Sequence, residues 1–198
     1  MNRFNRTACP AILAEKWKEW GDRYAYNREQ NPGFSFDWPE VQGKPLNQWL
    51  LPELLAMTQK HCSYCDGYPL RYADRTIDHF RPKSNPAFYG EVCRWENLYV
   101  SCSHCQKAKM EQYHPGLLRP DADDYDFNRY FVYNYADHTI HPNPLGSPSD
   151  QERAEVTIEL FRLNEPGLVE SRNIEYERFF ITDRGLPWET YSFRFILF

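Results

Sequence analysis

The sequence predicts an α+β protein that is mainly helical and is built around a zinc-stapled core. Three observations point to this class. Two Cys-x-x-Cys pairs have the spacing of a metal site. Short β-type stretches lie between the two pairs. On both sides of this central part, apolar and aromatic side chains recur at helical spacing.

The first 60 residues are expected to form an N-terminal helical region. Residues 10–26 and 45–57 each carry an apolar stripe at helical spacing, anchored by Trp17 and Trp20 in the first and by Trp49 in the second. Apolar residues make up 41% of the chain and aromatic residues 17%, which supplies enough buriable surface to exclude wholesale disorder. Neither a secretory signal nor an apolar run of about 18 residues occurs, so we expect a cytoplasmic protein with no membrane partner.

Cysteine spacing gives the strongest local signal. Two pairs, Cys62/Cys65 and Cys102/Cys105, are separated by 36 residues, whereas Cys9 and Cys93 stand alone. Each pair can turn two thiolates toward one point, and two pairs complete the tetrahedral sulfur shell of a structural zinc ion. Four unliganded cysteines or a redox pair are the alternatives. The two lone cysteines are expected to be small buried apolar groups.

A zinc ion held by four cysteines has no open coordination position, so any chemistry must lie elsewhere. The segment between the two pairs is the best candidate, within a core expected to span residues 61–120. Residues 76–84 begin as a β-type stretch and are interrupted at Pro82, residues 95–101 lead into a second short strand, and residues 106–111 favour a helix.

These residues resemble the HNH, or ββα-metal, endonucleases that carry a pair of zinc knuckles. The order and spacing of the motif match. Residues 77–84, 95–99 and 163–164 resemble, more narrowly, the PtuB-like HNH subunit of Septu-type anti-phage systems, versions of which accompany retrons. The matching motif residues are Cys62/Cys65, Asp78-His79, Asn97-Leu98, Cys102/Cys105, Gln106 and Lys109.

Phosphodiester hydrolysis needs a base for the attacking water and a cation for the charge that develops on the phosphate. His79 is the candidate base, because imidazole titrates near neutrality. Asp78 offers a hard oxygen suited to Mg²⁺ or a similar divalent ion. Neighbouring side chains alternate across a strand, so these two would point to different sides. The resemblance implies that Asn97 braces the loop that carries His79.

The resemblance also places a second metal ligand or electrostatic contact directly after the last knuckle cysteine. The family has His or Asn there, whereas this chain has Gln106. A glutamine carbonyl can bind a hard cation, but its longer side chain makes a water-mediated contact an alternative. His104 could compensate for this departure, or it could be an exposed knuckle residue.

Basic side chains around this segment suggest contacts with a phosphate backbone. Lys109 has the strongest individual case, from its motif position. The group comprises Arg75, Arg81, Lys83, Arg94, Lys107 and Lys109, interleaved with Tyr72, Phe80 and Tyr99. His61, His114, His138 and His141 lack metal-like neighbours and are expected to be structural or exposed.

The C-terminal region, residues 121–198, is expected to hold a hairpin near residues 131–140 and two helices over residues 149–163 and 168–181. The formal net charge of the chain is −5, and the regional values for residues 1–60, 61–120 and 121–198 are +1, +2 and −8. An acidic end of this kind suits a protein partner or solvent. Residues 191–198 are apolar and are expected to pair into a sheet, to pack on a partner, or to mark a cut end.

Taken with the resemblance, the residues predict a Mg²⁺-dependent HNH endonuclease that acts on DNA as the first choice, with structured RNA such as tRNA as an alternative. The resemblance implies an ATPase partner, a role in anti-phage defence, and association with a retron reverse transcriptase and its RNA–DNA product. The competing class is a non-catalytic zinc adaptor in which the nuclease centre has decayed at Gln106.

Overall fold

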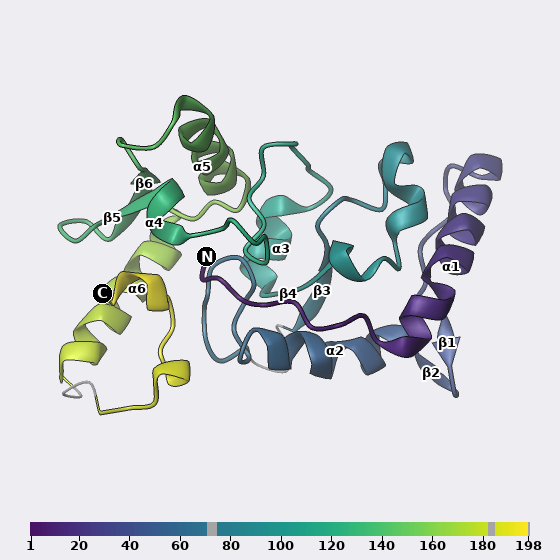
Figure 1. The fold of residues 1–198 in the computed structure, drawn as a ribbon, viewed down its shortest axis with the longest axis horizontal. Helices are drawn as coiled ribbons and strands as arrows, with labels where there is room; N and C mark the ends of the chain where they lie inside the picture. The colour runs from purple at the N-terminus through teal and green to yellow at the C-terminus, as the bar shows by residue number, and fades with distance from the viewer. Residues whose placement is uncertain (71–74, 182–184, 198) are drawn as a thin grey trace.

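The computed structural model describes residues 1–70, 75–181 and 185–197. Figure 1 shows an elongated molecule with a small hairpin and a helix near its middle, a long N-terminal helix at one end and the last helices at the other. The described elements are helices joined by short antiparallel sheets of two strands each. This mixed architecture, with its cysteine cluster, matches the coarse fold class that the sequence predicts.

The N-terminal region contains the two expected helices. Helix α1 spans Ala11–Gln30 and helix α2 spans Leu46–Met57, with a hairpin of β1 (Glu40–Val41) and β2 (Lys44–Pro45) between them. Helix α1 continues four residues beyond the expected end at residue 26. Helix α1 packs closely on the backbone around Gly90. A Cβ atom at Gly21 of this helix would lie 2.1 Å from the carbonyl oxygen of Gly90, so the position requires glycine.

The centre of the molecule is an antiparallel hairpin followed by a short helix. Strand β3 (Thr76–His79) pairs with β4 (Leu98–Ser101), so that Asp78 lies opposite Tyr99 and His79 opposite Leu98. The connection contains the 3₁₀ turns η2 (Pro86–Glu91) and η3 (Trp95–Asn97). Helix α3 spans Ser103–Lys109, whereas the sequence predicted helix over residues 106–111.

Helix α3 starts early because a knuckle cysteine caps it. The side chain of Cys102 accepts a hydrogen bond from the backbone N–H of Cys105, which satisfies one of the free donors of the first turn. The helix ends at Met110, whose φ of 48° is left-handed. Gln106 and Lys109 are three residues apart and therefore share one face of α3.

The C-terminal region also follows the expectation. Helix α4 (Phe127–Tyr130) leads into the hairpin of β5 (Phe131–Asn134) and β6 (Thr139–Pro142), and helices α5 (Pro148–Leu160) and α6 (Pro166–Ile181) follow. Turns η4 (Trp188–Thr190) and η5 (Arg194–Ile196) come last. Residues 191–194 are buried against the same chain, and the described residues 191–197 form no strand, so the expected pairing into a sheet was wrong for them. The alternatives of a partner contact and of a cut end stay predictions, and Phe198 lies outside the described residues.

Among the described helices, none combines the length and the apolar character needed to cross a bilayer.

Candidate metal centre and adjoining cleft

The four knuckle cysteines converge. Their sulfur atoms all lie within 4.8 Å of one another, and the Sγ atoms of Cys65 and Cys102 are 3.7 Å apart. Tetrahedral ligands at a zinc–sulfur distance of about 2.3 Å would lie roughly 3.8 Å from each other. Three of the cysteines are buried and Cys102 is half-buried. This donor set fits a zinc ion, and the cluster could hold one.

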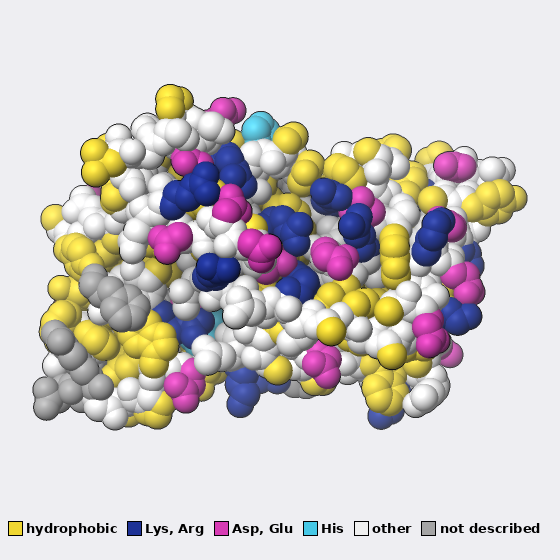
Figure 2. Space-filling model, in the orientation of Figure 1, with side chains coloured by type: hydrophobic (Ala, Val, Ile, Leu, Met, Phe, Trp, Pro, Cys, Tyr) yellow, Lys and Arg dark blue, Asp and Glu magenta, His cyan; other side chains and the backbone are white. Residues whose placement is uncertain are grey.

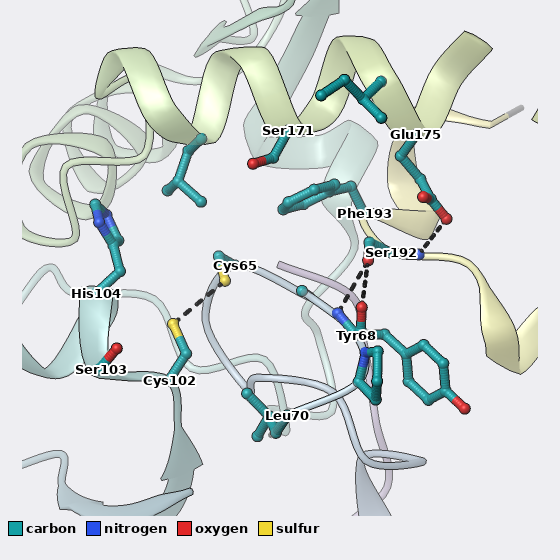
Figure 3. Close-up of a pocket in the computed structure, with 14 residues that line it drawn as sticks. Cys65, Tyr68, Leu70, Cys102, Ser103, His104, Ser171, Glu175, Ser192 and Phe193 are labelled. Atoms are coloured by element: carbon teal, nitrogen blue, oxygen red, sulfur yellow. Dashed lines mark hydrogen bonds between the residues drawn. The ribbon is translucent and has the colours of Figure 1, made fainter. Parts of the chain in front are cut away.

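Helix α6 and the end of the chain cover one side of this cluster. Figure 3 shows Cys65 and Cys102 facing each other beside a cavity of about 380 Å³, with Ser171 and Glu175 on the opposite wall. The Ser192 hydroxyl donates a hydrogen bond to the carbonyl oxygen of Tyr68 and accepts one from the backbone N–H of Tyr68, each at 3.0 Å. The first knuckle is thus held by the last segment of the chain.

A buried ion pair strengthens this attachment. The Arg194 guanidinium donates to both carboxylate oxygens of Asp66, at 3.1 Å from Nε to Oδ2 and 2.7 Å from Nη2 to Oδ1. Both side chains are almost fully buried. Asp66 directly follows Cys65, so the zinc knuckle depends on a residue more than a hundred positions away.

A separate cleft of about 230 Å³ opens beside the hairpin. Its walls include Asp78 and His79 from β3, Gln106 from α3, and Lys83 and Glu111 from the flanking loops. The hairpin register and the position of α3 bring together residues that are up to 33 positions apart. Three of the residues singled out from the sequence, Asp78, His79 and Gln106, therefore line one cavity.

The environment of His79 fixes its tautomer and its charge. Its Nε2 lies 2.9 Å from the carbonyl oxygen of Val92, which can only accept, so Nε2 carries the proton and Nδ1 keeps a lone pair. Burial lowers the pKa of His79 to about 4, helped by the positive charge of Lys83. Phe36 and Trp38 enclose the ring, with centroid distances of 5.3 and 5.5 Å. At pH 7 this imidazole is neutral and can accept a proton.

Asp78 is buried but partnered. Its carboxylate accepts a hydrogen bond from the Tyr64 hydroxyl at 2.8 Å and lies 3.2 Å from the Lys109 ammonium. Burial raises the pKa of Asp78, against the opposing effects of Lys109 and Tyr64. Together the two partners contact both carboxylate oxygens, which are of the hard type that Mg²⁺ or a similar cation could bind.

Asn97 ties the two ends of the connection between the strands. Its Oδ1 accepts from the N–H of Arg81 at 2.7 Å, and its Nδ2 donates to the carbonyl oxygens of Arg81 and Glu91 at 3.1 Å each. The backbone N–H of Phe80 donates to the Asn97 carbonyl at 2.9 Å. These four bonds hold the chain immediately after His79, which is the geometry that a bracing residue needs.

Two other motif residues differ in their surroundings. Lys109 is fully buried, and its Nζ donates to the carbonyl oxygen of His79 at 2.7 Å, so it cannot present its charge to a phosphate as the sequence suggested. The side chain of Gln106 lines the cleft and makes no hydrogen bond with the described residues. His104 lies in the other cavity, beside Cys102, and so it cannot replace Gln106.

Most of the expected basic group is paired within the chain. Arg81 donates to both carboxylate oxygens of Glu91, Lys83 pairs with Glu111 at 3.0 Å, and Arg94 lies near Glu91 and Glu96. On the face in Figure 2, Lys and Arg side chains alternate with Asp and Glu side chains. A continuous basic surface is therefore not seen on that face. Tyr72, also expected here, lies outside the described residues.

Four residues of this site were missed by the sequence reasoning. Tyr64 holds Asp78, Phe36 and Trp38 enclose His79, and Glu111 contributes a second carboxylate to the cleft. Burial acts to raise the pKa of Glu111, but hydrogen bonds from Ser84 and Lys83 outweigh this effect and lower that pKa. A signal existed for Tyr64, which lies inside the first knuckle motif. For the two aromatic residues there was none, because they are about 40 positions from His79.

Comparison with known proteins gives one finding of similarity. No family model matches the chain. A stretch of 73 residues is 29% identical to the Septu protein PtuB of Bacillus mycoides (strain KBAB4), and the match covers 31% of this chain and 25% of that protein. The chain thus has distant similarity, over part of its length, to a Septu protein, and it spans about a quarter of that protein's length.

Proposed function

We propose that this protein is a metal-dependent endonuclease of the HNH class that acts in Septu-type anti-phage defence. The observation that carries the proposal is the cleft in which a neutral histidine, a carboxylate and an amide meet. Strand β3, strand β4 and helix α3 follow one another as in a ββα-metal core, with the cysteine cluster beside them. The partial similarity to PtuB supports the defence role.

His79 acts as the general base in this proposal. The Val92 carbonyl fixes the proton on Nε2, which leaves Nδ1 to take a proton from the attacking water. Asn97 holds the chain beside His79, so the ring direction is set before substrate binds. Lys109 is a positioning residue that holds the His79 carbonyl and the Asp78 carboxylate in place. General-base assistance of this kind is typically worth ~10²–10⁴ in rate.

Asp78 and Gln106 would hold the catalytic divalent ion, for which Mg²⁺ is the first choice. Both offer oxygen donors and both line the cleft, which fits a hard cation that keeps several waters. A bound Mg²⁺ would supply charge stabilisation at the phosphate. Zinc in the cysteine cluster serves the fold alone, because four sulfur ligands leave no open position.

A nucleic-acid-binding partner completes the proposal. The chain has a formal net charge of −5, and much of its basic surface is neutralised by its own carboxylates. Affinity for a phosphate backbone depends on cations that are free to replace counterions. We therefore infer that an ATPase subunit of the Septu type delivers the substrate, with a retron reverse transcriptase and its RNA–DNA product as a further partner.

Cleavage assays test this proposal. The zinc-loaded chain, alone and with its partner, is incubated with DNA and RNA panels in the presence and absence of added Mg²⁺. Mg²⁺-dependent cleavage of DNA is the expected result. Cleavage of RNA alone would replace DNA by structured RNA such as tRNA as the substrate, and cleavage of neither would reject the nuclease.

A zinc-binding adaptor is the second candidate. It is favoured by the partnering of Asp78 with Lys109 and Tyr64, which reduces the freedom of the one carboxylate that β3 offers to a metal ion. A defence assay separates the two. In the nuclease the His79→Ala variant loses protection, whereas in an adaptor it keeps protection.

A further inference from the structure

A third cavity, of about 260 Å³, lies between helix α1 and the segment that follows it. Aromatic side chains dominate its walls, and they contact one another. The Tyr24 ring meets Phe34 at a centroid distance of 6.2 Å and Phe36 at 5.4 Å, and Phe36 meets Trp38 at 5.1 Å. The cavity is smaller than the roughly 300–1,000 Å³ typical of drug-sized ligands, so it suits a single small planar group.

This aromatic pocket lies next to the His79 cleft, because two of its rings contact His79. Phe36 packs edge-on against the His79 ring, and Trp38 stacks on it with an interplanar angle of 18°. The same two aromatic rings line the pocket. A group bound in the pocket therefore lies one aromatic ring away from the imidazole that would activate water.

The rim of the pocket is polar. Arg23 and Asn27 from helix α1 and Asp37 from the following segment line it. Within the residues that the structure describes, their side chains make no hydrogen bond or ion pair with the protein. A guanidinium, an amide and a carboxylate together offer both hydrogen-bond donors and acceptors, which is what the edge of a heteroaromatic ring requires.

We propose that this pocket binds one unpaired nucleobase of the nucleic acid whose phosphate enters the His79 cleft. The inference rests on the proposed nuclease function and specifies its substrate class: the nucleotide beside the cleaved bond is single-stranded. Every base has a π face, so stacking on aromatic side chains tolerates any sequence, and the polar rim adds contacts to the base edge. A base that is still paired within a duplex carries its partner with it, and the pair exceeds the pocket.

Phe34 is the residue that tests the pocket without disturbing His79. Its side chain is 37% exposed and contacts Tyr24 but not the imidazole. Tyr26 is the control, because it is an aromatic residue on helix α1, which forms one wall of the pocket, and it is 63% exposed and outside the pocket lining. The variants are Phe34→Ala, Phe34→Tyr as the conservative rescue, and Tyr26→Ala.

The first measurement is binding, carried out with the zinc-loaded chain and no added Mg²⁺ so that cleavage does not intervene. The probes are five-nucleotide single strands of DNA and of RNA, the same DNA strand without bases, and a short DNA duplex. We expect the single strands to bind more tightly than the baseless strand and the duplex. Phe34→Ala should lose about fivefold or more in affinity for the single strands, Phe34→Tyr should recover it, and Tyr26→Ala should match the unsubstituted chain.

Two results would overturn the base pocket: equal binding of the normal and the baseless strand, or Phe34→Ala and Tyr26→Ala variants that bind the single strand alike. A comparison of the DNA and RNA strands identifies which sugar the site prefers.

The second measurement is Mg²⁺-dependent cleavage by the same variants. If Phe34→Ala cleaves with unchanged KM and kcat, the proposed nuclease function is supported and the proposed base pocket is rejected. Base-dependent binding without cleavage keeps the pocket and rejects the nuclease.

Discussion

At the scale of single residues, the carbonyl of Val92 decides what His79 can do. Because it accepts the Nε2 proton at 2.9 Å, the other nitrogen is the one that can act as a base. Burial keeps the ring neutral at pH 7 but also makes it a weaker base than an exposed histidine. In the proposed nuclease, a divalent cation bound in the cleft would therefore have to supply a large share of the transition-state stabilisation.

The buried histidine also predicts how stability depends on pH. The pKa of His79 is lowered to about 4 in the folded chain, against about 6.5 when unfolded, so the unfolded state binds more protons in this window. Stability is then fully present above about pH 6.5 and falls as the pH falls toward 4. Charged groups near the ring, namely Lys83, Lys109 and Glu111, remain unchanged in a His79→Asn variant.

Denaturant unfolding at pH 7 and pH 5 measures this effect. Between these values the unsubstituted chain should lose about 2 kcal/mol more than the His79→Asn variant. Effects of proton uptake by the zinc cysteines occur in both proteins and cancel in the difference. Equal losses of unfolding free energy in the unsubstituted chain and the His79→Asn variant would mean that the His79 ring is not held in a buried, neutral state.

Asn97 offers a second test at this scale. The Asn97→Asp variant keeps the size of the side chain but replaces two donated hydrogen bonds by a carboxylate that faces two carbonyl oxygens. We expect a loss of at least about 2 kcal/mol in the free energy of unfolding. Asn31→Asp is the control, because Asn31 is exposed and uses only its oxygen, as an acceptor from Gly33. Similar stability of the two variants would contradict the bracing role.

At the scale of elements, helix α3 depends on the metal cluster. Cys102 both contributes sulfur to the cluster and caps α3, and Cys105 lies within the helix, so the helix that carries Gln106 begins inside the cysteine cluster. Structural zinc sites in small domains supply ~10–16 kcal/mol of folding free energy. The Cys102→Ala variant should lose zinc and most of its cooperative unfolding, measured by metal content and circular dichroism. Cys9→Ser, at a lone half-buried cysteine, should keep both. A folded, zinc-replete Cys102→Ala protein would contradict the cluster.

The C-terminal segment is a second support for the knuckle. The Arg194→Met variant leaves the buried Asp66 carboxylate unpaired, which typically costs about 3–5 kcal/mol. We expect a lower denaturation midpoint and faster release of zinc to a chelator. Arg129→Met, which breaks the exposed pairs with Asp124 and Asp150, is the control and should change neither. If zinc release is equally fast in both, the segment does not stabilise the knuckle.

Elements with a local signal were predicted from the sequence, and those set by distant contacts were not. Helical stripes located α1 and α2, and the cysteine spacing located the cluster. Helix α3 began three residues earlier than expected because its cap is a metal-site residue rather than a typical capping side chain. Residues 191–194 are held by hydrogen bonds to Asp66, Tyr68 and Glu175. These partners are distant in the sequence or lie on another element, so no local sequence pattern predicts the contacts.

At the scale of the whole molecule, the same limit applies to the candidate site. The motif spacing singled out Asp78, His79, Asn97 and Gln106. Of these, Asp78, His79 and Gln106 line one cleft. Sequence patterns did not reveal that Lys109 is buried or that Arg81 and Lys83 are paired, because ion pairing depends on tertiary neighbours. They also missed the aromatic enclosure of His79 by a loop that lies before helix α2.

Charge is distributed over the molecule in a way that suits a subunit of an assembly. The formal net charge is −5, because a net charge of −8 on residues 121–198 outweighs a net charge of +3 on residues 1–120. The His79 cleft is formed largely by the central hairpin and α3, whereas the acidic region lies toward one end of the elongated molecule (Figure 1). Under the proposed function, this separation would leave the acidic end for a protein partner and the centre for nucleic acid.

The most direct test of the account is nucleic-acid cleavage by the His79→Ala variant with its zinc content measured in the same preparation. The account predicts one zinc per chain in both proteins, Mg²⁺-dependent cleavage by the unsubstituted chain, and a loss of ~10²-fold or more in the variant. His141→Ala, which alters an exposed histidine on β6, should cleave as the unsubstituted chain does. Cleavage that survives in a zinc-replete His79→Ala protein would contradict the central claim.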